Sequence, residues 1–464
     1  MEIDKAKRRW VDKAKNKDIW KAVKLVSKAN ACHPLESVLS LFDCVSSAAE
    51  GINEAFASYF ISCQTPQRLP KVNDWGTLFE PHQVYKVLNN LPRSKASADL
   101  PFIVYKVAAH VIAEPLCHLF NISIDEGYVP LSWKTAKVIP LPKCASPGIN
   151  DLRPISLLST PLKILETLLL TVLSSKFISA YGNEQFGFRP GSSTSTALIS
   201  LHDKITYYLD KENVAGVQIL SYDFTKAFDK LCFDFIIQRL RSLNTFPSQA
   251  LRWFQSYLYD RKQSVQIGTV LSNPRAITSG VPQGSSLGPY LFAAAVGEFT
   301  LDNYDVHLIK YADDFVICCP LLKNSTNHHV VEAHDRLLSW VSDTSLTVNL
   351  KKCKSLVISS SLNCNPVFLH NVLPVEKIKL LGVIFNDKLS WKDHIDSVVA
   401  STSKSLFLFR LFRKYFKKSD LFRLYFGIIR SRLEYCAPLF LGLSDGDSLR
   451  LDRLQSRFQK GYLR

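Results

Sequence analysis

Two adjacent aspartates, Asp313 and Asp314, are the feature that most constrains how this 464-residue chain can fold. They interrupt the run "HLIKYADDFVICC", in which apolar residues precede and follow them. Apolar runs of this kind predict buried strands, and ionised carboxylates are costly there unless a positive partner neutralises them. The run therefore predicts a hydrophobic β-hairpin that carries two carboxylates and a cation close to them.

A third carboxylate, Asp223, ends another apolar stretch, "GVQILSYDF". Strands of this kind can lie side by side and present their carboxylates at one edge of a sheet. Three carboxylates at such an edge would suit two divalent cations, with Mg²⁺ as the hard ion that prefers oxygen ligands. Two ions about 4 Å apart can stabilise the attacking and leaving oxygens of a phosphoryl transfer. The alternative, an ordinary turn residue or helix cap, explains a single aspartate better than an adjacent pair.

Basic residues gather at the two ends of the chain. Residues 1–30 carry 10 Lys/Arg against 4 Asp/Glu, and residues 401–464 carry 14 against 5, so these ends supply most of the net charge of +16. This distribution favours contact with a polyanion such as nucleic acid, although basic ends can also serve solubility alone.

Secretion and membrane insertion are not expected. The 11 cysteines include no CxxC pair, which predicts reduced thiols in an intracellular protein. The N-terminus is charged from its second residue, unlike a signal peptide. The most apolar stretch, 155–178, is interrupted by Pro161, Lys163 and Glu166, so we expect a buried amphipathic helix there and no contact with a membrane.

The local patterns predict an α+β interior followed by a helical, basic C-terminal unit. Strands are expected at 216–224, around Asp313, at 355–359 and at 378–385, a β-hairpin over 261–281, and helices over 81–91, 100–127, 226–243 and 286–299. Beyond residue 393 the pattern is helical again, and its apolar stripe is expected to form a core beneath a basic face.

Eight blocks, in order, resemble those of reverse transcriptases. The hairpin carries "YADD" (311–314), and "DFTKAFDKL" (223–231) is similar to the first palm motif. The other blocks are "AKVIPLPK…NDLRPISLLSTPLKILE" (136–166), "EQFGFRPGSSTSTAL" (184–198), "SGVPQGSSLGPYLF" (279–292), "LTVNLKKCKS" (346–355), "KLLGVIFNDKLSWKDHI" (379–395) and the tail "RSRLEYCAP" (430–438) with "LDRLQSRFQKGYLR" (451–464). From about residue 50 onward the chain is identified as a member of the non-LTR, LINE-type and Jockey-like, reverse transcriptases.

The resemblance implies a right-hand polymerase fold of the α+β class, with fingers, a palm on an antiparallel sheet, and a helical thumb. The expected divisions are a helical connector (1–75), fingers with an N-terminal extension (76–205), a palm with inserted fingers elements (206–392) and a basic helical thumb (393–464), the reverse transcriptase domain covering about 123–386. Elements of this type usually encode an endonuclease as well. No such block precedes residue 50, so nicking of target DNA is not expected of this chain.

The resemblance also assigns the metal site. Asp223, Asp313 and Asp314, with the backbone carbonyl of Phe224, would hold two Mg²⁺ ions, with Mn²⁺ as a possible replacement. The implied reaction is attack of a primer 3′-hydroxyl on the α-phosphate of a dNTP, directed by an RNA template. Asp229 is expected to form a local hydrogen bond or cap instead of binding metal.

Further residues are assigned to the substrates by resemblance. Phe228 corresponds to a steric gate against the ribose 2′-hydroxyl, although its apolar neighbours also suit a core residue. The residues expected at the nucleotide are Lys143, Arg153, Gln283, Gly284 and Lys352. Lys352 is a candidate general acid, and Lys351 and Lys354 are alternatives to it. Leu381 and Gly382 are expected to hold the primer end.

Two other functions remain open. An RNA-templated RNA polymerase shares the palm, and a catalytically inactive RNA-binding remnant would retain the basic ends. The expected partners are an RNA template, a DNA primer or target, and dNTPs, and analogy with LINE-type elements places the work in the nucleus.

Overall fold

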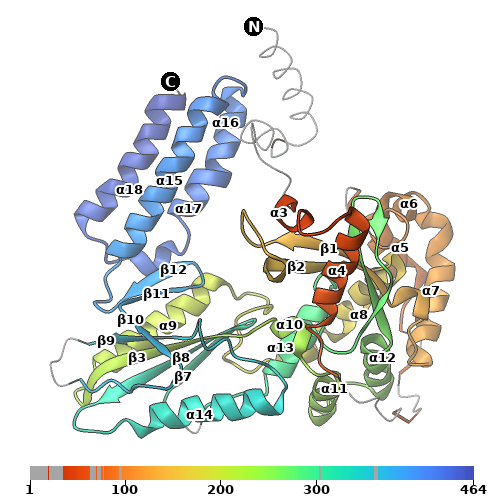
Figure 1. Cartoon of the computed structure of the whole chain (residues 1–464), viewed down its shortest axis with the longest axis horizontal. Coiled ribbons are helices and arrows are strands. Elements are labelled where there is room, and N and C mark those ends of the chain that lie inside the picture. Colours follow the sequence, from red (N-terminus) through yellow and green to blue (C-terminus); the bar gives the residue numbers. More distant parts are fainter. Residues whose placement is uncertain are drawn as a thin grey trace.

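The computed structural model describes residues 19, 35–62, 69–70, 75–76, 78–93, 97–302, 305–359 and 364–463. They form two five-stranded sheets with their covering helices, a small two-stranded sheet, and a helical bundle that stands apart from the two large sheets (Figure 1). This is the fingers, palm and thumb arrangement of the α+β class.

The palm sheet has five strands in the order β10-β9-β3-β8-β7. Its strands are β3 (Val214–Asp223), β7 (His307–Tyr311), β8 (Asp314–Leu322), β9 (Lys354–Ile358) and β10 (Leu373–Val375). All neighbours pair antiparallel except β10, which pairs parallel with β9, so the expectation of an antiparallel sheet is right for four of the five strands.

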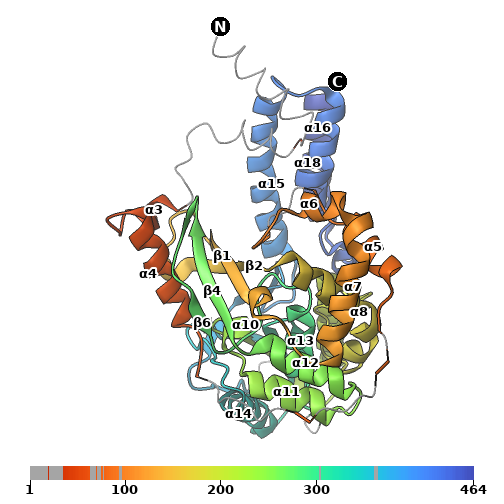
Figure 2. The same cartoon turned by 90° about the vertical axis from the view of Figure 1, so that its right-hand side faces the viewer.

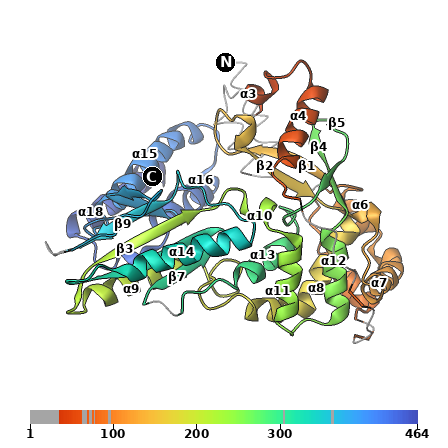
Figure 3. The same cartoon turned by 60° about the horizontal axis from the view of Figure 1, so that its bottom comes forward.

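Both faces of the palm sheet are covered, which explains why β3 is apolar along almost its whole length. Val217 and Ile219 pack into a core with α9 (Thr194–Leu209), β11 (Lys377–Leu380) and β12 (Val383–Asn386). Leu220 and Tyr222 face the opposite core. That second core includes α14 (His328–Asp343), which runs along the sheet in Figure 3.

The fingers sheet has the order β2-β1-β4-β5, with β6 also paired to β4. Its strands are β1 (Thr135–Pro142), β2 (Leu152–Leu157), β4 (Arg261–Ile267), β5 (Val270–Leu271) and β6 (Arg275–Ile277). Strands β4 to β6 form the hairpin expected over 261–281, and β4 joins β1 in parallel. Helix α4 (Val45–Ala57) lies against this sheet (Figure 2) and shares a hydrophobic core with it.

A layer of helices surrounds the fingers sheet and extends behind the palm. These are α3 (Glu36–Leu39), α5 (Pro81–Asn89), α6 (Phe102–Val107), α7 (Ala109–Asp125), α8 (Thr160–Ser179), α10 (Ala227–Lys230), α11 (Phe233–Ser242), α12 (Ser248–Leu258) and α13 (Gly288–Val296), with the short 3₁₀ turns η1 (Leu131–Trp133) and η2 (Ile149–Asp151). Within the described ranges, no helix is long and apolar enough to cross a membrane.

The thumb comprises the helices after residue 391 and has a core of its own. Its elements are α15 (Lys392–Phe412), α16 (Lys418–Leu424), η3 (Tyr425–Arg430), α17 (Ser431–Leu433), η4 (Ala437–Phe440), α18 (Asp445–Phe458) and η5 (Gln459–Leu463). Leu406, Phe409 and Phe412 of α15 pack against Leu424 and Phe458 from the other helices. The expected apolar stripe therefore forms a core, as the periodicity predicted.

Three expected helices differ from the structure, and one of them, expected over 100–127, is divided into α6 and α7. The stretch 155–178 begins as the end of β2, because Ile155 pairs with Ile139, and α8 starts only at Thr160 with Pro161 in its first turn. The helix expected over 226–243 is divided into α10 and α11. Here the N–H groups of Gly280 and Val281 bond the carbonyls of Leu231 and Phe228, so tertiary hydrogen bonds replace helical ones.

Candidate active site

The strand register brings the three predicted carboxylates together. Asp223 and Asp314 are directly opposite each other in the last pair of the β3–β8 ladder, and Asp314 also pairs with Tyr311 across the hairpin. Ala312 and Asp313 form the turn between β7 and β8, and Ala312 has a left-handed φ of 56°. The hairpin expected around the aspartate pair is therefore present, and Asp313 lies at its tip.

The carboxylates influence one another electrostatically. Loss of hydration raises the pKa of Asp313, the charge of Asp223 raises it further, and Arg153 and Lys143 act in the opposite direction. Loss of hydration and the charges of Asp313 and Asp223 raise the pKa of Asp314 to about 6. Like charges that raise the pKa of Asp313 and Asp314 favour a cation close to them.

Lys352 supplies one positive charge at this cluster. Its Nζ lies 3.4 Å from Oδ2 of Asp223. The backbone explains the placement, because the N–H of Asn349 donates to the carbonyl of Asp223 at 2.7 Å and the N–H of Lys352 donates to the carbonyl of Asn349 at 2.8 Å. Asp223 forms its ion pair with Lys352 and with neither of the alternatives that the sequence left open.

The residues fit a hard divalent cation by chemistry. Carboxylate oxygens are the ligands that Mg²⁺ and Mn²⁺ prefer. In the described part of the chain, no three His, Cys, Asp or Glu side chains already form a complete ligand set. Asp223 would therefore have to exchange its ion pair with Lys352 for the ion.

Two exposed cations from the region of the fingers sheet act electrostatically on Asp313. Arg153 lies on β2 opposite Leu141, and the N–H of Lys143 donates to the carbonyl of Asp151 at 2.9 Å, which closes the end of the β1–β2 hairpin. The charges of Arg153 and Lys143 both lower the pKa of Asp313, against the effect of burial.

Phe228 lies in α10, five residues after Asp223, and is half-buried. Its ring stacks on Phe292 with centroids 4.2 Å apart and an interplanar angle of 17°. The ring of Phe188 approaches it edge-on at 6.3 Å. These contacts fix the orientation of the ring while part of it stays accessible, so they accommodate both a packing role and a contact with a substrate.

Gln283 contacts Asp229 in this structure. Its Nε2 donates to Oδ1 and Oδ2 of Asp229 at 2.8 and 2.9 Å. Burial raises the pKa of Asp229 to about 6, although the hydrogen bond from Gln283 and the charge of Lys226 oppose the shift. The side chain of Asp229 thus bonds a residue 54 positions away in the chain, and not a local group as expected from the sequence.

Gly284 meets the protein's own backbone. It has φ +124°, and a Cβ there would lie 2.5 Å from the carbonyl oxygen of Ser156. The N–H of Ser156 in turn donates to the carbonyl of Gln283 at 2.7 Å. The backbone at Gly284 is therefore in close contact with β2. Two residues after Gly284, the N–H of Ser286 donates to the buried carboxylate of Glu166 at 2.7 Å, which holds the same loop.

Leu381 and Gly382 form the turn between β11 and β12. The hydroxyl of Tyr435 donates to the carbonyl of Leu381 at 2.6 Å and lies 2.9 Å from Oγ1 of Thr194. This turn is therefore connected to the start of α9 on one side and to the beginning of η4 on the other.

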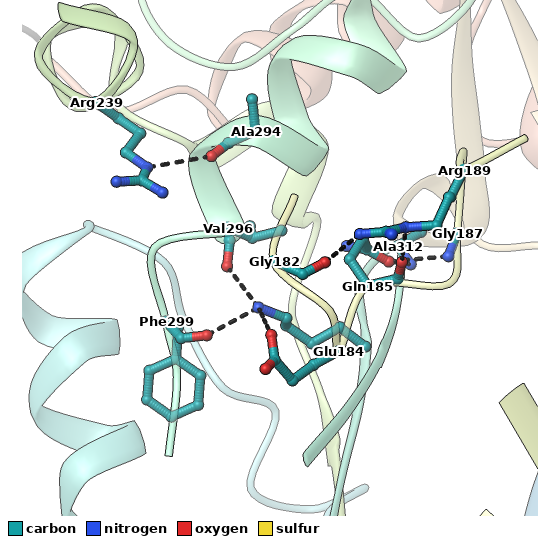
Figure 4. A network of polar contacts seen from close by, with 11 residues as sticks. Gly182, Glu184, Gln185, Gly187, Arg189, Arg239, Ala294, Val296, Phe299 and Ala312 are labelled. Atoms are coloured by element: carbon teal, nitrogen blue, oxygen red, sulfur yellow. Dashed lines mark hydrogen bonds and ion pairs between the residues drawn. The ribbon is translucent and has the colours of Figure 1, made fainter. Parts of the chain in front are cut away.

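Two residues near the site were not assigned from the sequence. Lys226 has a left-handed φ of 54°, its ammonium group lies over the ring of Tyr59, and burial lowers its pKa to about 8. Gln185 bonds the carboxylate turn (Figure 4). Both lie in blocks that resemble the family, but nothing in the local pattern shows that Lys226 approaches Tyr59 or that Gln185 approaches Ala312.

Comparison with known proteins follows the same blocks. The family model described as "Reverse transcriptase (RNA-dependent DNA polymerase)" matches residues 141–385. The RNA-directed DNA polymerase from mobile element jockey of Drosophila melanogaster is 27% identical over 68% of this chain and 36% of its own length. Its counterpart in Drosophila funebris is 30% identical over 73% of this chain and 38% of its own length. The chain therefore spans less than two fifths of these relatives.

Among solved structures, the apo telomerase from Candida tropicalis is similar, with a TM-score of 0.44 and 12% identity over 76% of this chain and 64% of that one. The family match is the stronger finding, because it covers more than half of the chain and includes the carboxylates, the fingers cations and the loop of Gln283. The chain belongs to the reverse transcriptase (RNA-dependent DNA polymerase) family.

Proposed function

We propose that this chain is an RNA-directed DNA polymerase that joins deoxynucleotides to a primer 3′-hydroxyl on an RNA template. The observation that carries the proposal is the register of β3 and β8, which places Asp223 opposite Asp314 with Asp313 at the adjacent turn. Phosphoryl transfer depends chiefly on positioning and on neutralising charge, and this arrangement with its surrounding cations supplies both.

The three aspartates and the backbone carbonyl of Phe224 would hold two Mg²⁺ ions, which Mn²⁺ can replace. When bound, such ions lower the pKa of a primer hydroxyl and neutralise the charge of the leaving pyrophosphate. Lys352 would donate a proton from its Nζ to the pyrophosphate, since its ammonium group already lies beside Asp223. Lys143 and Arg153 would bind the triphosphate, for which a point charge and a planar guanidinium are both suited.

The remaining assigned residues orient the other substrates. Phe228 would exclude a 2′-hydroxyl, and Gln283 and Gly284 would shape the floor below the base. The turn Leu381–Gly382 would support the primer end, and the basic thumb would follow the phosphates of an RNA–DNA hybrid.

The test is extension of an oligo(dT) primer on poly(rA) with dTTP and Mg²⁺, with wild type beside Asp313→Asn. We expect extension by wild type and a loss of at least a thousandfold in the variant, because the amide removes a charge from the metal site. Binding of the hybrid should be retained by the variant. Asp313→Asn that extends the primer normally, or loses binding instead of synthesis, would contradict the metal assignment.

The alternative functions give different results in the same assay. An RNA-binding remnant would bind the hybrid without extension by wild type, and an RNA polymerase would use UTP as well as dTTP. The proposal includes a nuclear site of action, which rests on analogy with mobile elements and is tested by imaging a tagged chain.

A further inference from the structure

The segment 182–189 runs beside the strand that leads into the carboxylate turn (Figure 4). The N–H of Lys310 donates to the carbonyl of Glu184 at 2.8 Å, and the N–H of Phe186 donates to the carbonyl of Lys310 at 2.8 Å. Gln185 and Lys310 therefore form an isolated parallel β-bridge outside the palm sheet. Nothing in the proposed mechanism so far uses this segment.

Gln185 forms a side-chain hydrogen bond to the backbone of the carboxylate turn. Its side chain is fully buried, and its Oε1 accepts from the N–H of Ala312 at 3.1 Å and from the N–H of Gly187 at 3.0 Å. Ala312 has a positive φ, a conformation that a residue with a Cβ adopts only where its surroundings hold it. The glutamine oxygen thus satisfies the N–H of the residue immediately before Asp313.

Gly187 brings the segment close enough for this contact. A Cβ at this position would lie 2.6 Å from the backbone nitrogen of Ala312 and 3.2 Å from Oε1 of Gln185. Two backbones can approach this closely only without a side chain between them. The close approach of the segment to the turn therefore also depends on Gly187, independently of the hydrogen bond to Gln185.

The segment is itself held from several sides. Arg189 donates through Nε to the carbonyl of Gln185 at 3.0 Å and also bonds the carbonyl of Gly182. The buried Nζ of Lys310 donates to the carbonyl of Phe299 at 2.8 Å and lies 3.7 Å from Oε2 of Glu184. Because the segment 182–189 is itself fixed by these contacts, it can define the position of the carboxylate turn.

We propose that Gln185 is a positioning residue for the carboxylate turn, and that its amide oxygen fixes Ala312 so that Asp313 and Asp314 stand correctly toward Asp223. The inference rests on the proposed function for its kinetic consequence, because it deepens the account of the same site. A displacement of about 1 Å at a phosphoryl-transfer site can lower the rate by about a hundredfold.

The test uses two variants and a matched control in the full chain. Gln185→Met keeps the approximate volume of the side chain and removes the acceptor oxygen. Gly187→Ala keeps that oxygen and displaces the turn through the added methyl group. The control is Gln249→Met. Gln249 is also a buried glutamine, and its Nε2 donates to the carbonyl of Trp75 at 3.0 Å. It lies in α12, a helix that contributes no carboxylate to the site. Thermal unfolding of all three variants separates loss of folding from loss of positioning.

Two readouts are needed. One is kcat for dTTP on the poly(rA) hybrid at several Mg²⁺ concentrations, with KM for the hybrid. The other is Mn²⁺ binding to the protein alone, followed by the relaxation of water protons. We expect Gln185→Met and Gly187→Ala to lower kcat by about ten- to a hundredfold and to raise the half-saturating metal concentration, with KM for the hybrid unchanged. The Gln249→Met control should match wild type in kcat, in KM for the hybrid and in the half-saturating metal concentration.

The outcomes distinguish this inference from the proposed function. If wild type does not extend the primer, the proposed function fails, and weakened Mn²⁺ binding by the two variants would still support the positioning role. Unchanged Mn²⁺ binding by both variants, or kcat equal to that of the control, would overturn the inference. If Gln185→Met does not fold, Gly187→Ala decides by the same measurements.

Discussion

Among single residues, Phe228 combines a visible packing role with a proposed role at the nucleotide sugar. Its stack on Phe292 holds the ring in one orientation, as a gate would require. We predict that Phe228→Val raises the use of UTP relative to dTTP by about tenfold or more, because the smaller side chain leaves room for the 2′-hydroxyl. Competition between the two nucleotides in primer extension measures the ratio.

The control for this prediction is Phe246→Val. Phe246 is buried and contacts Phe177 with centroids 4.9 Å apart, so its truncation also removes an aromatic contact from the core. Both variants should lose stability, by about 1 to 3 kcal/mol. If Phe228→Val keeps the wild-type preference for dTTP over UTP and is as stable as Phe246→Val, Phe228 acts only as a core residue.

Elements are placed by contacts that their own sequences do not contain. The turn between β11 and β12 is one example, because the hydroxyl of Tyr435, 54 residues away in the chain, bonds the carbonyl of Leu381. We predict that Tyr435→Phe raises KM for the template–primer about three- to tenfold, which corresponds to the loss of about one hydrogen bond. KM for dTTP should stay unchanged, since the turn is assigned to the primer.

Tyr105→Phe is the control, because it too removes a tyrosine hydroxyl that donates a hydrogen bond, here from α6 to Oδ2 of Asp99 at 2.9 Å. Steady-state kinetics with either substrate varied separates the two effects. Equal KM values for the hybrid in both variants would show that the Tyr435 hydroxyl does not position the primer turn.

For the whole molecule, the charged thumb predicts binding of nucleic acid that depends on salt. Lys404 and Lys414 are exposed on the thumb. We predict that their joint replacement by Gln lowers the slope of log Kd against log salt by about 2, with little effect on kcat, because each phosphate contact releases counterions. Fluorescence anisotropy of a labelled hybrid at several salt concentrations measures the slope.

A joint replacement of Lys86 and Lys323 by Gln removes the same charge elsewhere. Both lysines are exposed, in α5 and after β8 respectively, and neither belongs to the thumb. The slope of this control should match wild type. Equal slopes for the two double variants would show that the thumb does not contact phosphate, and that its charge serves solubility.

Much of the chain could be predicted from local patterns. The apolar strand ending in Asp223, the hairpin at Asp313 and Asp314, and the helical thumb follow from hydrophobic periodicity, which reports what each residue buries. The order of the blocks gave the family, which the match over residues 141–385 confirms. The expected helix start at residue 155 and the expected continuous helix over 226–243 were wrong, because hydrogen bonds from other parts of the chain decide these boundaries.

What the sequence alone determined is therefore the α+β class, the family and the three carboxylates. Only the tertiary structure decided which groups surround them, because those contacts join residues far apart in the chain. It gave Asp223 its partner Lys352, engaged Gln283 with Asp229, and placed Gln185 against Ala312. Periodicity reports whether a side chain is buried, but the partner of a buried polar group is chosen by the packing of whole elements.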